Sequence, residues 1–497
     1  MKYKTVPYKH QIEALKRASS SKIFALLMEQ GTGKSKVIID GIAADYPAIK
    51  AVLIIAPNGV NANWIRNEIP THLDDSIPRL AVVWKSSGHS IKYKRLLLKL
   101  LQPFDGVKIL AMNVEAFSAK RPPEFAEKFL RSVSPSQAMI VVDESTRIKS
   151  HQAKRTKAVL KLKTLADTRR ILTGTPITQS PLDVFTQFSF LDPKIIGFNS
   201  YYAFKCHFAQ IVQRIAIDGA GRSYKYEDVV GYKNLDELHN KISKFSFRVL
   251  KSDCLDLPDK IYTRLIVPMA DEQRRIYEKL RDDFVLEAQK DAEIPVPLVL
   301  TRLLRMQQVT GGYVPDDAGG GRELEDNPKL NVLISDISDL PENESVIVWA
   351  RFRNEIESIA ARLRVFSGGK KNAVGVYYGS TNVAERAEII DRFQRGETRF
   401  FVGNQQTAGL GLTLTAATTV YYYSNDFSLE SRTQSEDRCH RIGQKKHVVY
   451  KDIVCENTID EYVLNALKSK RDVADAVLKD GAVAAVRKNT VDIAGAM

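Results

Sequence analysis

Residues 23–44 read IFALLMEQGTGKSKVIIDGIAA, and they guide the interpretation of the whole first half of the chain. The apolar run Ile23–Met28 predicts a buried strand, and Val37–Ala44 has the composition of a helix. Between them lies Glu29–Ser35, a loop with two glycines. A strand that leads through a glycine-rich loop into a helix is the arrangement that binds phosphate in many nucleotide-binding proteins.

The loop residues explain how a triphosphate could be held. Gly31 and Gly33 allow backbone N–H groups to wrap a phosphate, while Lys34 reaches the terminal phosphates and the Ser35 hydroxyl can hold Mg²⁺. Met28 occupies the place of the first glycine in the full pattern, so a chance glycine-rich turn is the alternative. The residues expected to bind ATP in this segment are Gln30, Gly31, Thr32, Gly33, Lys34 and Ser35.

A second apolar strand ends in two acids, because Asp143 and Glu144 directly follow Val141-Val142. At the carboxyl end of a strand, the first acid can bind Mg²⁺ and the second can orient and deprotonate the attacking water. A solvated turn is the alternative interpretation, which the upstream Lys34 disfavours. We therefore expect Lys34, Asp143 and Glu144 to be catalytic, with Ser35 and Asp143 as the metal site.

Short apolar strands alternate with helical stretches in both halves of the chain. This alternation predicts parallel sheets covered by helices, and hence an α/β protein with two domains in tandem. The strands expected in the first half are Ile23–Met28, Val52–Ala56, Val107–Ala111, Met139–Val142 and Ile171–Thr173. Those expected in the second half are Val346–Ala350, Val374–Tyr378, Phe400–Val402, Val420–Tyr423 and Val448–Val454.

The middle of the chain has a different pattern. From Pro193 to Gln308 the periodicity is helical rather than strand-like, as in Asp271–Leu286, so we expect helical insertions there. Pro315–Pro328 has acids and consecutive glycines but few apolar residues, which predicts a flexible interdomain loop. The expected division is domain 1 over 1–192, insertions and linker over 193–325, domain 2 over 326–470 and a C-terminal tail over 471–497.

The bulk properties narrow the class of protein. The 497 residues exceed one ordinary core, and the formal net charge of +14 favours a polyanionic partner, because lysines and arginines that neutralise phosphates release counterions. No apolar run could span a membrane and no signal peptide is apparent, so we expect a cytoplasmic or nucleoid-associated protein, in the host cytoplasm if a phage encodes it. The four cysteines are scattered, without the spacing of a zinc site.

Phosphoryl transfer needs positive charge at the γ-phosphate in the transition state, and an arginine brought there raises the rate by about 10³- to 10⁵-fold. Residues 434–444, QSEDRCHRIGQ, contain the candidates. On a helix Arg438 and Arg441 lie three residues apart, hence on one face. A solvated basic helix is the alternative interpretation, since charge patterns on helices are common.

Together these segments resemble the Snf-two (Swi/Snf) family of helicase-like ATPases in helicase superfamily two, and in particular its compact bacterial or phage members. The resemblance covers nearly the whole chain. It rests on YKHQ (8–11), IIAP (54–57) with Asn63-Trp64, DESTRIK (143–149), LTGTPI (172–177), LKSD (250–253), GLGLTL (409–414) and residues 434–444. The family has two RecA-like domains with ATP bound between them, and we expect the same here.

The resemblance also implies roles for individual residues. Gln11 is expected to read the adenine, Gly409 to contact ATP, and Gln434, Arg438 and Arg441 to be catalytic, with the two arginines as fingers. The residues expected to couple the ATP site to nucleic acid are Thr173, Gly174 and Thr175.

Two positions depart from the family pattern. Thr146 stands where relatives usually carry histidine, so the contact between that ring and residues 434–444 is absent or replaced. Gln406 stands where relatives often have arginine, which changes one expected contact. We expect the first departure to affect coupling rather than hydrolysis.

Nucleic acid is expected to contact both domains through its backbone, because backbone contacts position a protein without reading sequence. The residues expected to make these contacts are Asn58, Asn63, Arg351, Arg353, Asn404, Thr407 and Thr413. A separate basic run is formed by Lys154, Arg155, Lys157 and Lys161, for which a solvated helix face is an equally good interpretation. Trp64, Trp84 and Trp349 lie in apolar contexts and are expected in the core.

We therefore expect a DNA-dependent ATPase that uses ATP and Mg²⁺ and moves along double-stranded DNA as its domains close on ATP and open after hydrolysis. A strand-separating DNA helicase is an alternative, and an inactive DNA-binding scaffold subunit is an alternative of another class. Single strands and RNA stay open as substrates. The chain is expected to work as a monomer without a membrane, and its protein partners are not predicted.

Overall fold

The computed structural model describes residues 3–58, 60–86, 88, 90–217, 223–254, 257–290, 296–316, 321–370, 372–379, 381–408, 412–441 and 443–478. The chain divides into two compact units. Unit 1 comprises Met1–Gln210, Val230–Asp256 and Asp472–Met497, and unit 2 comprises Ile211–Val229 and Leu257–Arg471. Within the described residues, no helix combines the length and the apolar character needed to cross a membrane.

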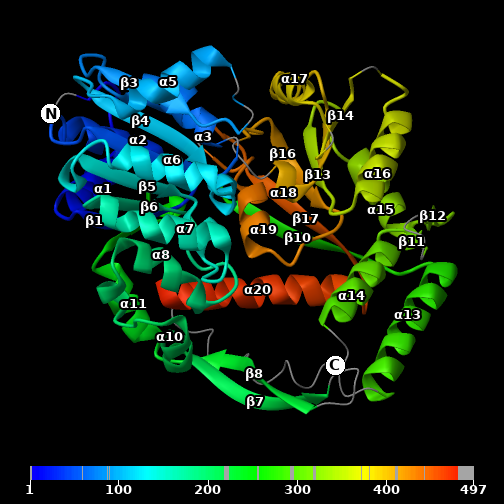
Figure 1. Cartoon of the computed structure of the whole chain (residues 1–497). Coiled ribbons are helices and arrows are strands. Elements are labelled where there is room, and N and C mark those ends of the chain that lie inside the picture. Colours follow the sequence, from blue (N-terminus) through cyan, green and yellow to red (C-terminus); the bar gives the residue numbers. More distant parts are fainter. Residues whose placement is uncertain are drawn as a thin grey trace. The chain divides into compact units, whose positions relative to one another are not determined.

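Unit 1 is built on a seven-stranded sheet in the order β3-β4-β2-β5-β6-β1-β9, in which every pair is parallel (Figure 1). The strands are β1 (Ile23–Met28), β2 (Ala51–Ala56), β3 (Arg79–Val83), β4 (Val107–Asn113), β5 (Ala138–Asp143), β6 (Thr168–Leu172) and β9 (Ser246–Val249). Every residue of β2 and β5 is buried. Such continuous burial is typical of a parallel sheet that is covered on both faces.

Helices cover this sheet, drawn in blue to cyan in Figure 1. They include α1 (Lys9–Ser19), α2 (Lys34–Ala44), α6 (Arg121–Leu130), α7 (Lys154–Leu162) and α8 (Val184–Leu191). All eight residues of α8 are buried, and its polar side chains, Thr186, Gln187 and Ser189, donate hydrogen bonds to backbone carbonyl oxygens. By contrast α7 buries only Thr156, Val159 and Leu162, so its other side faces solvent.

Unit 2 is built on a six-stranded parallel sheet in the order β10-β17-β16-β13-β15-β14. The strands are β10 (Lys260–Val267), β13 (Ser345–Trp349), β14 (Val374–Tyr377), β15 (Phe400–Gly403), β16 (Ala417–Tyr422) and β17 (Val448–Cys455). Alternate residues of β13 enter two different cores, since Val346 and Val348 pack in one while Ile347 and Trp349 pack in the other. This alternation reflects the two-residue period of a strand. The structure therefore confirms the expected α/β class with two parallel sheets.

Along the chain, the helices of unit 2 precede, separate and follow its strands. They include α13 (Asp271–Lys290), α14 (Val296–Thr310), α15 (Pro328–Ser338), α16 (Arg353–Phe366), α17 (Val383–Gln394), α19 (Leu429–Glu436) and α20 (Ile459–Leu478). The helical pattern expected around Asp271–Leu286 is confirmed by α13.

The expectation that 193–308 lacks strands is wrong. β9 pairs with β1 in the first sheet, β10 pairs with β17 in the second, and β7 (Ala209–Ile217) and β8 (Ser223–Tyr232) form a separate two-stranded sheet. β9 has four residues and β10 is largely exposed, so neither shows the continuous apolar run of a central strand. Each is an edge strand whose partner lies far away in sequence.

The observed units also divide the chain differently from the expected domains. The segment expected as insertions and linker, 193–325, is shared by the two units, and α20 continues past position 471 to Leu478. Part of the expected loop Pro315–Pro328 lies outside the described residues, while β11 (Tyr313–Pro315) and β12 (Gly321–Glu323) pair as antiparallel strands.

Candidate active site

The phosphate-binding loop connects β1 to α2 in unit 1. Gly31 and Gly33 have φ values of 84° and 86°, a region that residues with a Cβ rarely adopt. A Cβ on Gly33 would lie 2.2 Å from Nε2 of Gln11, so this glycine also permits a close approach. Gln11 is buried, donates from Nε2 to the Thr32 carbonyl oxygen at 3.0 Å and accepts from the Tyr8 N–H at 3.0 Å. The hydrogen bond to Thr32 attaches Gln11 to the loop. Its contact with adenine stays a prediction.

Lys34 is the first residue of α2 and is buried. Its Nζ donates to the carbonyl oxygens of Met28 and Glu29, at 2.9 and 3.3 Å. Both acceptors are neutral, and a phosphate oxygen is a stronger acceptor because it is charged. The ammonium is therefore positioned at the loop and can exchange these carbonyls for a terminal phosphate. Ser35 follows at a half-buried position.

The two acids stand at the end of β5, where both side chains are buried. Glu144 has φ 47° and ψ 61°, the left-handed conformation that is uncommon outside glycine. Such backbone strain costs about 1–3 kcal/mol and concentrates at functional sites. The Asp143 carboxylate accepts from the Glu144 N–H at 3.0 Å and from Nε1 of Trp64 at 2.8 Å.

Asp143 fits the expected metal role chemically. Burial raises the pKa of its carboxyl, and the Trp64 hydrogen bond and the charge of Lys34 oppose this rise by favouring the ionised form. A carboxylate offers about four lone-pair sites, and the two hydrogen bonds above leave room for Mg²⁺ or one of its waters. The half-buried hydroxyl of Ser35 is of the kind that Mg²⁺ accepts as a ligand.

The residues expected to couple the site lie against Glu144. Thr173 Oγ1 donates to Oε2 of Glu144 at 3.5 Å and accepts from the Thr175 N–H at 3.1 Å. On the other side, Nε2 of Gln30 donates to Oε1 of Glu144 at 3.3 Å. A Cβ on Gly174 would lie 3.1 Å from the Gln30 backbone nitrogen, which shows how closely the loops approach. Unit 1 therefore brings the phosphate loop, the acids and the coupling segment together.

Trp64 is a site residue that sequence reasoning placed only in the core. It is 1% exposed, so the core prediction is confirmed, but its indole N–H also holds the Asp143 carboxylate. The signal was its position directly after Asn63, shortly beyond the IIAP segment (54–57). An indole N–H has one donor and no acceptor role, so it favours the ionised carboxylate.

Replacing Trp64 by phenylalanine is expected to lower ATP turnover at pH 6 by about tenfold, because a hydrogen bond to a charged group contributes about 1.5–3 kcal/mol. Loss of the donor raises the pKa of Asp143 further, so the acid limb of the rate profile moves to higher pH and the defect shrinks at pH 8. Turnover measured from pH 5.5 to 8.5 checks this.

Trp84→Phe is the matched control, since the buried Nε1 of Trp84 has no hydrogen-bond partner among the described residues. Its pH profile should match the parent. Parallel profiles for Trp64→Phe and the parent would contradict the assigned role of Trp64.

Thr146 stands where relatives in the family usually carry histidine. Its side chain is buried, and within the described part of the chain its Oγ1 has no hydrogen-bond partner. The neighbouring Ser145 instead donates to Oε1 of Gln187 at 2.6 Å, inside unit 1. The loop after the acids is therefore fixed by residues around Thr146 rather than by Thr146 itself.

In unit 2, α19 ends at Glu436, so the expectation that Arg438 and Arg441 lie on a helix is wrong. The chain continues in tight turns because distant partners hold it: the His440 ring lies 2.7 Å from the Pro258 carbonyl oxygen, and Gln444 donates to the Ala417 carbonyl oxygen at 3.0 Å. The two arginines are nonetheless brought together.

Arg438 and Arg441 converge on one backbone atom. Each donates from Nη1 to the Leu412 carbonyl oxygen, at 3.3 and 3.2 Å, and Arg441 also donates to Oγ1 of Thr413 at 3.0 Å. Arg438 is buried and also bonds the Gln434 carbonyl oxygen, whereas Arg441 is only half-buried. Gly409 lies outside the described residues.

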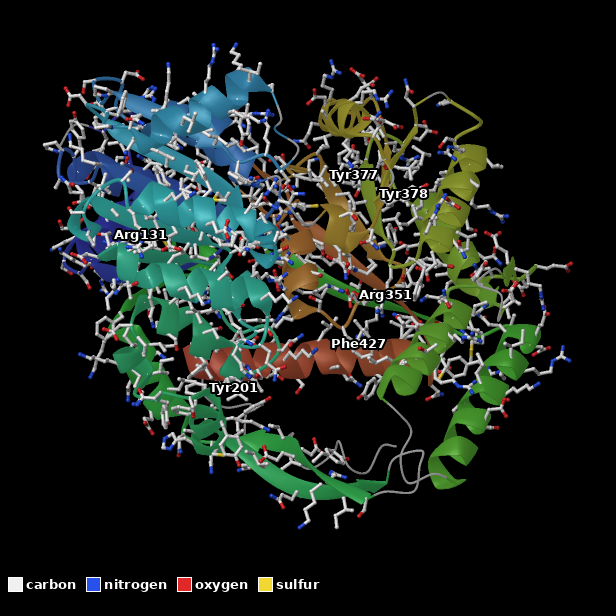
Figure 2. All side chains as sticks on the ribbon, viewed as in Figure 1. Arg131, Tyr201, Arg351, Tyr377, Tyr378 and Phe427 are labelled. Atoms are coloured by element: carbon white, nitrogen blue, oxygen red, sulfur yellow. The ribbon has the colours of Figure 1, made fainter. Side chains whose placement is uncertain are left out.

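The residues predicted to contact nucleic acid are divided between the two units. In unit 2, Nδ2 of Asn404 donates to the Arg351 carbonyl oxygen at 2.7 Å, and the Arg351 guanidinium (labelled in Figure 2) donates to Gln307 at 2.6 Å. Arg353 is exposed and pairs instead with Glu357. Of the other predicted residues, Asn58 is exposed, Asn63 donates a hydrogen bond to Glu68, and Thr407 is half-buried. Gln406, which stands where relatives often have arginine, donates a hydrogen bond to Asp426.

A phosphate-binding loop, an adjacent Asp-Glu pair and a second parallel sheet with clustered arginines define the class of helicase-like ATPases. The SNF2-related domain model matches residues 7–310, and the helicase conserved C-terminal domain model matches residues 328–443. The chain belongs to the SNF2-related family, as its motifs predicted.

Several named proteins are similar to this chain. An uncharacterized ATP-dependent helicase, MG018 of Mycoplasma genitalium, is 25% identical over 95% of this chain and 42% of its own length. A putative ATP-dependent helicase/translocase, YwqA of Bacillus subtilis, is 26% identical over 68% of this chain and 35% of its own length. The chain spans less than half the length of these relatives. The Sulfolobus solfataricus SWI2/SNF2 ATPase core in complex with dsDNA has a TM-score of 0.41 at 23% identity, covering 96% of this chain and 94% of that one.

Proposed function

We propose that this protein is a nucleic-acid-stimulated ATPase that moves along double-stranded DNA. The observation that carries the proposal is the environment of Glu144, which is held in a left-handed conformation between Gln30 of the phosphate loop and Thr173 of the coupling segment. A carboxylate held there can accept a proton from a water that attacks the γ-phosphate. The net charge of +14 supports a polyanionic partner, as does the similarity to YwqA, a putative helicase/translocase.

Each residue of the candidate site would have a separate role in the proposed reaction. Lys34 would bind the terminal phosphates, and Gln11 would hold the loop or read the base. Mg²⁺, held by Ser35 and Asp143, would neutralise phosphate charge. Arg438 and Arg441 of unit 2 would supply positive charge in the transition state when the units close on ATP. Repeated closure and opening of the two units would then advance the DNA contacts of one unit relative to those of the other along the duplex.

The proposal is tested by measuring phosphate release with ATP alone and with a 40-base-pair duplex, a single strand of the same length, or RNA. We expect turnover to rise at least about tenfold with duplex DNA, because closure of the units on the duplex would bring arginines toward the γ-phosphate, and one such arginine contributes about 10³–10⁵ in rate. Lys34→Ala should abolish the stimulated rate. Equal turnover with and without nucleic acid would refute the proposal, and no turnover at all would favour the scaffold alternative.

A second assay separates translocation from strand separation. A translocase displaces a third strand from a triplex without opening the duplex, whereas a helicase also opens a forked duplex. We expect displacement of the third strand only.

A further inference from the structure

We propose that one face of α7, formed by Lys154, Lys157 and Lys161, binds the phosphodiester backbone of duplex DNA. The inference rests on the proposed function and adds a contact that the motif residues do not include. The three lysines are called the lysine face below. All three side chains are exposed, while the opposite side of the helix is buried against unit 1.

The spacing of the lysine face suits a phosphate backbone. Residues at i, i+3 and i+7 lie within about 60° of one another around a helix and span about 10 Å along its axis. A single DNA strand carries one phosphate per about 3.4 Å of duplex axis, so about three phosphates of one strand cover the same length. Ala158, which lies at the edge of this face, is small and half-buried.

Helix stability explains only one residue of the lysine face. Lys161 lies in the last turn of α7, where positive charge is favourable, whereas Lys154 and Lys157 lie in a first turn without acids, where positive charge is unfavourable by about 0.3–1 kcal/mol per residue. Within the described residues, none of the three lysines forms an ion pair with an acid, so the like charges are not offset by the favourable pairs that stabilise exposed helices. A face that costs stability and attracts anions is the pattern expected of a binding surface.

Hydrogen bonds and helix contacts within unit 1 hold α7, which follows the two acids along the chain. The chain reaches α7 through the short helix that follows Glu144, and Nε of Arg155 donates to the Arg147 carbonyl oxygen at 2.9 Å. Thr156 Oγ1 donates to the Ile148 carbonyl oxygen at 3.3 Å. α7 also packs beside α6 and α8 (Figure 1). α7 is therefore held in place by unit 1, and its first residue, Lys154, follows the short helix at the carboxyl end of β5, on the edge where ligands of α/β sheets bind.

A second lysine-rich helix of unit 1 provides a matched comparison. α5 (Ile91–Leu101) carries Lys92, Lys94 and Lys99, which are all exposed. At 100° per residue Lys94 points away from the side that carries Lys92 and Lys99, so these three cannot follow one strand together. Removing them changes the net charge by the same amount as removing the lysine face.

The test measures the affinity for a 40-base-pair duplex of mixed sequence by fluorescence anisotropy between 50 and 300 mM salt. We expect the triple variant Lys154→Gln, Lys157→Gln, Lys161→Gln to bind at least about tenfold more weakly at 100 mM salt, with a log affinity against log salt slope shallower by about 2.7, or 0.9 for each lost phosphate contact. Each single variant should lose about 0.9 of the slope. Melting temperatures check that the variants are folded.

The control triple variant Lys92→Gln, Lys94→Gln, Lys99→Gln should keep the parent slope. An unchanged slope in the α7 variant, or an equal loss in the control, would overturn the inference while leaving a duplex-stimulated parent enzyme intact. If the parent neither binds duplex DNA nor is stimulated by it, the proposed function itself fails.

Discussion

Glu144→Gln is expected to lower kcat for ATP hydrolysis by about 10²- to 10⁴-fold, the range that general-base catalysis contributes. Glutamine keeps the size but only one acceptor oxygen, so it can accept from Gln30 or from Thr173 but not from both, and it cannot take a proton from water. Affinity for ATP should change little, because the proposed phosphate contacts come from the loop around Lys34 and not from Glu144. Single-turnover hydrolysis and equilibrium nucleotide binding, measured on the same preparation, check both parts.

Two further variants separate catalysis from folding. Glu144→Gly should also lose activity but melt at a higher temperature than Glu144→Gln, because glycine adopts φ 47° without the strain that other residues carry there. Glu127→Gln changes a half-buried acid of α6 that pairs with Arg131 at the end of the helix, and it should leave kcat unchanged. Retention of more than about a tenth of the parent kcat in Glu144→Gln would rule out the general-base role.

Arg441→Ala is expected to lower kcat by about 10³-fold or more, since an arginine that reaches the γ-phosphate contributes about 10³–10⁵. Arg441 is the better test of the pair because it is half-buried, whereas Arg438 is buried and bonds both the Gln434 and Leu412 carbonyl oxygens. Removal of Arg438 would take this donor from the buried Gln434 carbonyl oxygen, although Arg441 would still bond the Leu412 carbonyl oxygen, and it would destabilise unit 2 as well. The measurement is kcat with saturating ATP and duplex DNA.

Arg441→Lys adds a test of geometry, because lysine keeps the charge but loses the planar fork of the guanidinium. It should recover only a small part of the lost rate. Arg395→Ala is the control, an exposed arginine of unit 2 that pairs with Glu397, and its kcat should equal that of the parent. A loss of less than about tenfold in Arg441→Ala would exclude a transition-state role for this residue.

Much of the fold could be predicted from local sequence. Ile23–Met28 is a strand with the predicted bounds, and the four other strands expected in the first half appear within a few residues of their expected ends. Central strands are identifiable because each carries its own continuous apolar run. β9 and β10 were missed because an edge strand is short or polar, and its identity depends on a partner elsewhere in the chain.

The candidate site also contains residues that local sequence could predict and residues that it could not. Lys34, Asp143 and Glu144 were identifiable because each stands at a fixed offset from an apolar strand. The role of Trp64 was not, since its indole meets Asp143 only after two strands have paired side by side in the sheet. The expected helix through Arg438 and Arg441 was wrong, because distant carbonyl groups end it early.

The amino-acid sequence alone determined the two parallel sheets, the phosphate loop, the pair of acids and the basic character, because each depends on residues that are neighbours along the chain. Tertiary structure decided the left-handed backbone of Glu144, its contacts with Gln30 and Thr173, and the convergence of Arg438 and Arg441 on Leu412. Those features arise when strands and loops from distant positions meet. Local periodicity contains no information about which partners will meet.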